Sequence, residues 1–307
     1  MFTNRYHLVF IGFLLLAVAA RVAHAAPLPT LDCHDPRAAP TNQPNAYYDG
    51  FFIGRDGCFY DPSKIDIQDV PPVLGASGDQ KLRLWQVNGA NSSPLKAYIQ
   101  MHEIAQAVNL PILGIYNASD EQGAATDLAE AYIQKHTPAI NSIVTQIQLA
   151  LDRQEEVFVR SGSQGTLLLS EALKQIRAHY ERATQSGIRL KQIMQRIMIE
   201  THGGVVHVYP NGPRYVHYAN RLDAAVESLG VLSPGSHPGA SAVIVTFSGR
   251  VEPSETQYQT LSPAWKLFLS THGQTVYLAH RVPFAKAYSH ANPDGAITKV
   301  SYDELMR

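Results

Sequence analysis

The sequence predicts an α/β fold in which a mostly parallel sheet is covered by helices on both faces. From residue 82 onward, short apolar segments typical of strands alternate with longer helical segments, as in chains of β-α units. The 307 residues are 45% hydrophobic and 17% charged, which is enough apolar sequence for a sizeable core. Lys and Arg number 25 against 26 Asp and Glu, and no basic block indicates binding to nucleic acid.

Residues 1–25 have the pattern of a secretory signal peptide. Arg5 begins a short basic region, residues 8–20 form an apolar run, and Ala23 and Ala25 supply the small residues of a cleavage site. The apolar run is shorter than the ~20 residues that a membrane-spanning helix needs. We therefore expect cleavage after Ala25, export to the periplasm or the extracellular space, and no membrane span in the mature chain.

Residues 26–80 are rich in turn-forming residues and predict an irregular N-terminal extension, with a small strand at 51–53. This segment contains both cysteines of the chain, Cys33 and Cys58. In an exported protein two such thiols pair as a disulfide, which in the chain-entropy model contributes roughly 3 kcal/mol for a loop of this length. A catalytic thiol is the alternative, but neither cysteine lies in a Cys-x-x-Cys motif or a strand-to-helix turn.

Residues 81–307 predict the α/β domain itself. Residues 82–87 form an apolar strand that ends at Asn88-Gly89, and residues 94–108 form a helix with Ser93 as its N-cap. A second strand follows at 112–116. Residues 124–151 are helical in pattern, and Pro138 can break this helix.

The second half of the domain continues the alternation. Residues 156–160 predict a strand and residues 166–182 a helix. Two further strands are predicted at 205–209 and 215–219, separated by a turn at 211–213. Residues 242–247 are predicted as the last strand.

The segment that carries chemistry is EVFVRSGSQGTLLL, residues 156–169, in which a strand leads through a serine turn into a helix. A nucleophile elbow needs this order, because the serine has a strained backbone and small residues must stand two positions before and after it. Gly165 meets this demand, and Ser161 replaces the usual first glycine. The motif predicts Ser163 as a nucleophile at the start of a helix, where free N–H groups can stabilise an oxyanion. The alternative is an ordinary turn between strand and helix.

Over residues 82–280 the chain resembles the α/β-hydrolase superfamily, in its lipase/esterase-like branch. Four segments carry the resemblance in order: the early strand with its loop at 85–90, the elbow at 161–165, the late strand at 218–223, and Thr271-His272-Gly273. The resemblance implies a triad of Ser163, Asp223 and His272 in the superfamily's order of serine, acid and histidine. It also implies oxyanion N–H groups from Gln164 and from Ala90 or its neighbour, and it places the histidine in the loop after the last strand.

Several of these assignments have alternatives. Asp223 can serve instead as the N-cap of a helix over 224–229, or it can do both. The other acids considered, Glu227 and Asp120, fit less well, because Glu227 lies inside that helix and Asp120 comes before the serine. His280 and His290 also follow the strand at 242–247, although Gly273 next to His272 permits an unusual turn. His272 itself can instead be a surface histidine or one that ends a helix.

His202 stands before Gly203-Gly204, as in the oxyanion loop of some esterases, but it follows the serine in sequence, where that loop does not belong. The histidine spacings do not match a metal site, and we expect neither a metal nor another cofactor. Asn91 and Asn117 match the glycosylation pattern by chance. Residues 263–270 are apolar and aromatic on one side, which fits a lid, the wall of an acyl pocket or a packed helix.

These observations predict an exported serine hydrolase that cleaves a carboxylic ester of lipid or small-molecule type through an acyl-enzyme on Ser163. Because the same triad cleaves amides, the type of bond stays open. The alternative is a non-catalytic binding or structural protein that keeps an α/β-hydrolase scaffold, since a fold does not imply a function.

Overall fold

The computed structural model describes residues 33–40, 43–75, 81–90, 92–118, 137–251 and 263–307. The predicted signal peptide, residues 1–25, lies outside the described residues. No helix in the described ranges is long and apolar enough to cross a membrane.

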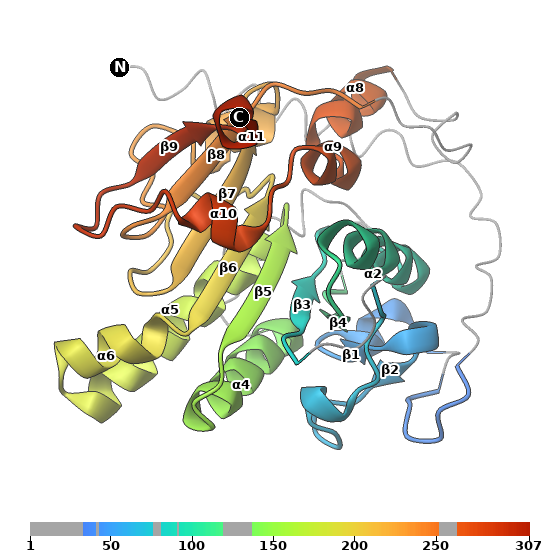
Figure 1. Cartoon of the computed structure of the whole chain (residues 1–307). Helices are drawn as coiled ribbons and strands as arrows, with labels where there is room; N and C mark the ends of the chain where they lie inside the picture. The colour runs from blue at the N-terminus through green and yellow to red at the C-terminus, as the bar shows by residue number, and fades with distance from the viewer. Residues whose placement is uncertain (1–32, 41–42, 76–80, 91, 119–136, 252–262) are drawn as a thin grey trace, which may run out of the picture.

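A mixed sheet forms the centre of the fold (Figure 1). In the described part of the chain it has nine strands in the order β2-β1-β4-β3-β5-β6-β7-β8-β9. All neighbours from β4 to β9 pair in parallel, whereas β1 pairs antiparallel with both β2 and β4. The strands are β1 (Phe52–Ile53), β2 (Phe59–Tyr60), β3 (Leu84–Val87), β4 (Ile112–Ile115), β5 (Val157–Gly162), β6 (Ile197–His202), β7 (Arg214–Asn220), β8 (Val243–Phe247) and β9 (Thr298–Ser301).

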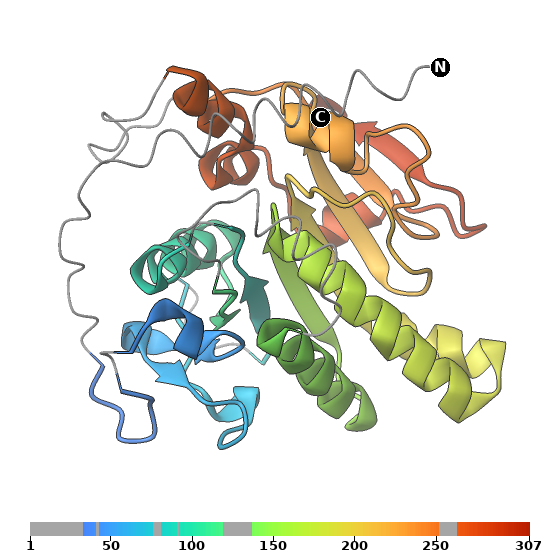
Figure 2. The ribbon, with the colours of Figure 1, turned by 180° about the vertical axis from the view of Figure 1, so that it is seen from behind.

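Helices cover both faces of the sheet (Figures 1 and 2). One face carries α4 (Pro138–Asp152), α5 (Gly165–Thr184), α6 (Gly187–Met194) and α7 (Ala224–Leu229). The other carries α2 (Pro94–Val108), α9 (Gln274–Ala279), α10 (Phe284–Tyr288) and α11 (Tyr302–Met306). Alternate residues of each strand therefore enter two separate hydrophobic clusters, with Val157 and Val159 in one and Phe158 in the other. The predicted α/β class, a mostly parallel sheet of α/β-hydrolase-like type, is confirmed.

Several predicted elements have the expected bounds. Helix α2 occupies residues 94–108 as predicted, and the Ser93 Oγ accepts a hydrogen bond from the Lys96 N–H at 3.3 Å. Pro138 begins α4 after the extended N-cap Thr137, a position where its missing N–H costs nothing. The earlier part of the predicted helix, residues 124–136, lies outside the described residues.

One predicted strand is absent, one strand was not predicted, and one more strand follows the predicted last one. Residues 205–209 form no strand and contribute only an isolated bridge between Val208 and His237. Strand β6 (Ile197–His202) was not predicted, because Glu200 and His202 interrupt its apolar pattern although both are buried. Residues 242–247 do not form the last strand. Strand β9 follows at the sheet edge, where only Val300 is buried.

The N-terminal extension is largely irregular, and it joins the sheet. Its strands β1 and β2 extend the edge beside β4, and three short 3-10 helices, η1 (Asn45–Tyr48), η2 (Arg55–Gly57) and η3 (Ile67–Asp69), lie before, between and after them. The predicted disulfide between Cys33 and Cys58 is confirmed, with an S–S distance of 2.06 Å. Cys58 is buried next to β2, so the bridge attaches the start of the described chain to the edge of the sheet.

Candidate active site

Ser163 lies in the tight turn between β5 and α5. Its φ of 48° is in the left-handed region, which costs a residue other than glycine roughly 1–3 kcal/mol. The turn is held on both sides. The Ser163 N–H donates to the carbonyl of His202 at 3.2 Å, and the Ser163 carbonyl accepts from the Thr166 hydroxyl at 2.6 Å and from its N–H at 3.1 Å.

Close packing explains why the residue two positions after Ser163 is glycine. A Cβ at Gly165 would lie 2.6 Å from the carbonyl oxygen of Asn88 and 2.9 Å from that of Val87, too close for either. Two positions before Ser163, a side chain is accommodated. Ser161 is fully buried, and its Oγ has no hydrogen-bond partner among the described residues. The departure from glycine at this position is therefore compatible with the turn.

His272 brings its imidazole to Ser163 from the end of a helix. The predicted loop position is wrong, because His272 is the last residue of α8 (Pro263–His272), between β8 and β9. Its Nε2 lies 2.9 Å from the Ser163 Oγ. The ring of Phe268, one turn earlier, stacks on the imidazole with 4.6 Å between centroids. Gly273 has an ordinary φ of −64°, so the unusual turn that a glycine permits is not used there.

Asp223 makes the contacts of both roles considered for it. Its Oδ1 accepts the N–H of Ala225 at 3.0 Å and so caps α7, while its Oδ2 lies 2.6 Å from the His272 Nδ1. The same Oδ2 accepts a third hydrogen bond, from the hydroxyl of Tyr277 at 2.7 Å. Burial and the charge of Asp223 raise the pKa of Tyr277 well above its usual range, so its hydroxyl stays protonated and donates.

These contacts join three residues that are far apart in the sequence into one hydrogen-bonded chain. Because the Asp223 carboxylate accepts at the His272 Nδ1, this nitrogen carries the proton, and the Nε2 is free to accept from the Ser163 hydroxyl. This tautomer is the one that a general base for serine requires.

Amide side chains connect the loop after β3 to the residue after Ser163. The Asn88 Oδ1 accepts from the Asn117 N–H at 2.8 Å, and the Asn88 Nδ2 donates to the Asn117 carbonyl at 2.8 Å. The Asn117 Nδ2 in turn donates to the Gln164 Oε1 at 3.0 Å. Gln164 is thereby fixed at the start of α5, and Gly89 lies against Ser163, since a Cβ on it would be 3.1 Å from the Ser163 Cβ. The oxyanion roles of the Gln164 and Ala90 N–H groups remain predictions.

The alternative site residues lie elsewhere. The His280 Nδ1 bonds to the carbonyl of Val276, and its ring stacks on Phe247 at 4.2 Å. His290 is exposed after α10, and Glu227 is exposed on α7. Asp120 and Asn91 lie outside the described residues. The side chain of Asn117 is buried and hydrogen-bonded, which leaves no room for a glycan there.

A buried charged cluster, which we call the β5–β6 cluster, lies beside the serine turn and was not predicted. It consists of Arg160, Glu200, His202 and Arg281. The Arg160 Nη2 lies 2.7 Å from the His202 Nδ1, and the His202 Nε2 lies 2.9 Å from the Glu200 Oε1. Arg281 binds both oxygens of Glu200, at 2.8 and 3.0 Å. The only signal in the sequence was the presence of charges within two apolar segments.

The charges of this cluster determine the protonation state of His202. Burial, followed by the charge of Arg160, lowers the pKa of His202 to about 3 despite the nearby Glu200. The neutral ring accepts from Arg160 at Nδ1 and donates from Nε2 to Glu200. Burial opposes ionisation of Glu200, but Arg281 and His202 hold the pKa of this carboxyl well below its usual range. At neutral pH Glu200 is therefore ionised and His202 is neutral, and both are hydrogen-bonded.

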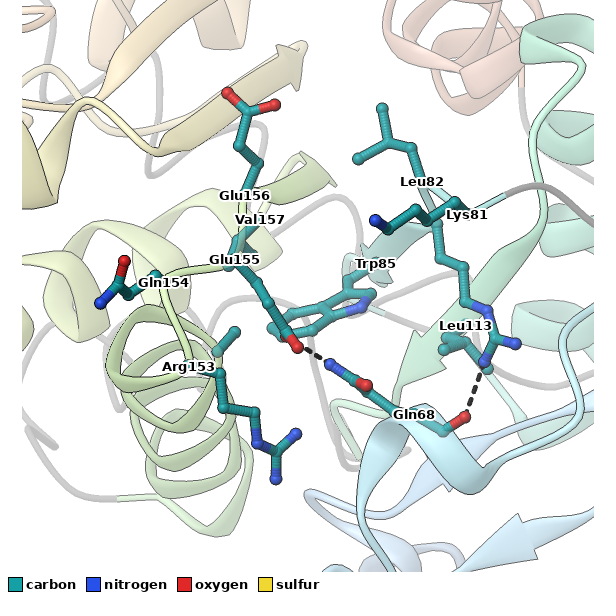
Figure 3. Close-up of a pocket in the computed structure, with 12 residues that line it drawn as sticks. Gln68, Lys81, Leu82, Trp85, Leu113, Arg153, Gln154, Glu155, Glu156 and Val157 are labelled. Carbon is teal, nitrogen blue, oxygen red and sulfur yellow. Dashed lines mark hydrogen bonds between the residues drawn. The ribbon is translucent and has the colours of Figure 1, made fainter.

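Neither a metal-ligand cluster nor the large pocket adds to this site. Among the described residues, no group of three His, Cys, Asp or Glu could hold a metal ion. A pocket of about 900 Å³ lies at the amino ends of the central strands (Figure 3). Leu82 and Arg83, which precede β3, and Glu156, which precedes β5, line it. There Gln68 bonds to Glu155 and, through its carbonyl, to Arg83. Ser163 follows the other end of β5, so a ligand in this pocket would not reach it.

Comparisons with known proteins add little. No protein-family model matches the chain. No curated protein matches it either. A solved structure, Thermogutta terrifontis esterase 2 phosphoramylated by tabun, is similar over 73% of this chain and 72% of its own, at 13% identity and a TM-score of 0.25. So low a TM-score supports no conclusion about function, which has to come from the geometry of the chain itself.

Proposed function

We propose that the chain is an exported serine hydrolase that cleaves a carboxylic ester, of lipid or small-molecule type, through an acyl-enzyme on Ser163. One observation carries the proposal: the hydrogen-bonded chain from Asp223 through His272 to Ser163, with the serine in a strained turn at the start of α5. Each of these residues comes from a different connection at the carboxyl ends of the strands, where parallel sheets place their active sites.

The geometry suits each step of ester cleavage. His272 takes the hydroxyl proton at Nε2 while the Ser163 Oγ attacks the carbonyl carbon, and Asp223 stabilises the imidazolium. The tetrahedral oxyanion binds the N–H groups of Gln164 and Ala90, each worth roughly 10²–10³ in turnover. His272 then returns the proton to the leaving alcohol, and the acyl-enzyme remains. Water, deprotonated by the same Nε2, releases the acid and restores Ser163.

The proposal of export rests on two features. The first 25 residues have the pattern of a signal peptide, and the disulfide between Cys33 and Cys58 suits an oxidising compartment. Mass spectrometry of the protein secreted by its host should find Ala26 as the N-terminal residue. An intact leader on protein from the cell interior would contradict export.

A fluorophosphonate probe tests the enzyme directly, because it phosphonylates only an activated serine. We expect the wild type to be labelled and Ser163→Ala to lose the label. Ser170→Ala is the matched control, since it removes another buried hydroxyl of α5, bonded to the carbonyl of Val208. If the folded wild type is not labelled, the alternative of a non-catalytic scaffold protein is favoured.

The identity of the base is tested by comparing two histidines. His272→Ala should reduce ester hydrolysis by several orders of magnitude, as expected for a triad base. His280→Ala removes a ring that stacks on Phe247 and should retain most activity once circular dichroism shows that it is folded. The reverse result would overturn the assignment. Rates with matched nitrophenyl esters and nitroanilides will show which bond is cleaved.

A further inference from the structure

Asp223 holds more hydrogen bonds than a triad requires. Its carboxylate is fully buried and accepts from the Ala225 N–H at Oδ1 and from both His272 and Tyr277 at Oδ2. The Tyr277 hydroxyl and the imidazole therefore share one oxygen, at 2.7 and 2.6 Å. A change in the negative charge on this oxygen therefore changes the strength of its hydrogen bond to His272.

Tyr277 is fixed in place by three elements. It belongs to α9, is almost completely buried, and packs its ring edge-on against Phe247 of β8 at 5.3 Å. Gly203, directly after β6, makes room for the phenol. It has a φ of 59°, and a Cβ on it would lie 3.0 Å from the ring and 3.2 Å from the hydroxyl. Packing against Tyr277 therefore explains the glycine at position 203 without an oxyanion loop.

We propose that Tyr277 is a positioning residue for the base: its hydroxyl holds the Asp223 Oδ2 against the His272 Nδ1 and lowers the proton affinity of His272. This inference rests on the proposed hydrolase function. A hydrogen bond to a carboxylate withdraws charge from it, so the imidazolium gains less from the pair. Without Tyr277, the carboxylate attracts the proton on His272 more strongly and is held only by the Ala225 N–H and by His272.

Few other charged groups face this pair. The ring centroids of His202, on β6, and Tyr277 are 5.9 Å apart. Asp223 accepts the hydrogen bond from the Tyr277 hydroxyl. His280 ends α9 and stacks on Phe247, which Tyr277 also touches. On α2, Glu103 accepts a hydrogen bond from Gln274, and beyond His202 lies the β5–β6 cluster. The wild type and Tyr277→Phe both contain all of these groups, so a difference between their pH profiles reports on the Tyr277 hydroxyl.

The test is the pH profile of kcat/KM for Tyr277→Phe. We expect the midpoint of the acid limb to rise by roughly one pH unit, since hydrogen bonds to a charged partner shift pKa values by this order. We also expect kcat to fall roughly tenfold with little change in KM, because the lost contact orients the base rather than the substrate.

Tyr180→Phe is the matched control. Tyr180 also donates its hydroxyl to an aspartate, because its OH lies 2.6 Å from Asp152 Oδ1. It lies about 20 Å along α5 from the serine turn, so its loss should not affect the base. Its profile should coincide with that of the wild type. An acid limb within 0.2 unit of the wild type in Tyr277→Phe, together with unchanged kcat, would overturn the inference while leaving the hydrolase intact. An unlabelled, inactive wild type would overturn the proposed function itself.

If Tyr277→Phe does not fold, 3-fluorotyrosine at position 277 keeps the test decisive. The fluorinated phenol is a stronger hydrogen-bond donor of nearly the same size, so the acid limb should move to lower pH. A midpoint that stays in place or rises would refute a role of the hydroxyl in setting the base.

Discussion

The β5–β6 cluster makes the stability of the fold sensitive to acid, and His202→Gln isolates the part that His202 contributes. Glutamine can accept from Arg160 and donate to Glu200, as the neutral imidazole does, but it does not titrate. Arg160, Glu200 and His202 are buried, so the contacts among them belong to the folded state alone.

The expected magnitude follows from the pKa of His202 in the two states. Folding lowers it from the ordinary 6.5 to about 3, so between these values only the unfolded chain binds the proton. The stabilisation is therefore fully present above pH 6.5 and is lost as the pH falls towards 3. One such proton changes the free energy of unfolding by about 1.4 kcal/mol per pH unit, or about 2 kcal/mol between pH 6 and 4.5.

Urea unfolding, followed by circular dichroism at half-unit steps from pH 7 to 4.5, measures this difference. Carboxylates titrate in the same range, so the informative quantity is the stability of the wild type minus that of His202→Gln. We expect this difference to shrink by about 2 kcal/mol from pH 6 to 4.5. His179→Gln, at an exposed position on α5, should run parallel to the wild type. Parallel curves for His202→Gln as well would refute the assignment of a neutral, buried His202.

Three further perturbations have defined outcomes. Replacing Cys33 and Cys58 together with serine should cost roughly 3 kcal/mol of unfolding free energy in urea titrations without changing the catalytic pH profile; unchanged stability would show that the bridge constrains nothing. Gly165→Ala places a methyl group 2.6 Å from the carbonyl of Asn88, so probe labelling should slow by at least tenfold, whereas wild-type labelling would mean that the turn has room to move. Asn117→Leu removes the amide that connects the loop after β3 to Gln164, and kcat should fall by roughly 10²-fold at similar KM, as for a lost oxyanion donor; a change confined to KM would contradict this role.

The serine turn could be predicted from the sequence because its signal is local. A strand, a serine between small residues and a helix follow one another within residues 156–169, and the backbone strain of Ser163 requires that composition. Asp223 and His272 were predicted from the order of the triad residues along the chain. This order does not predict whether each residue lies in a loop or in a helix. For this reason His272 was expected in a loop, although it ends α8.

The parts that escaped prediction depend on partners distant in sequence. Glu200 makes the sequence of β6 look polar, and its burial depends on His202 and on Arg281, which lies 81 residues later in the chain. Tyr277 lies in no motif, and nothing before the fold is known relates it to Asp223. Buried charges inside apolar segments are the one signal that could have been followed, since such groups are rarely buried without a partner.

His202 links the charged cluster to the serine turn. Its carbonyl accepts the N–H of Ser163, while its ring is bound by Arg160, three residues before that serine on the neighbouring strand. The strained turn is thus attached to β6 through the backbone and through the side chain. Acid should therefore inactivate the protein in two separable ways. In the proposed hydrolase, protonation of His272 removes the base while the chain stays folded, whereas protonation of His202 breaks the buried hydrogen bond from Arg160 and favours unfolding. Because only the unfolded chain binds the His202 proton between pH 6.5 and 3, the loss of stability begins near pH 6.5 and grows as the pH falls, so circular dichroism and activity followed over the same pH range separate the two events.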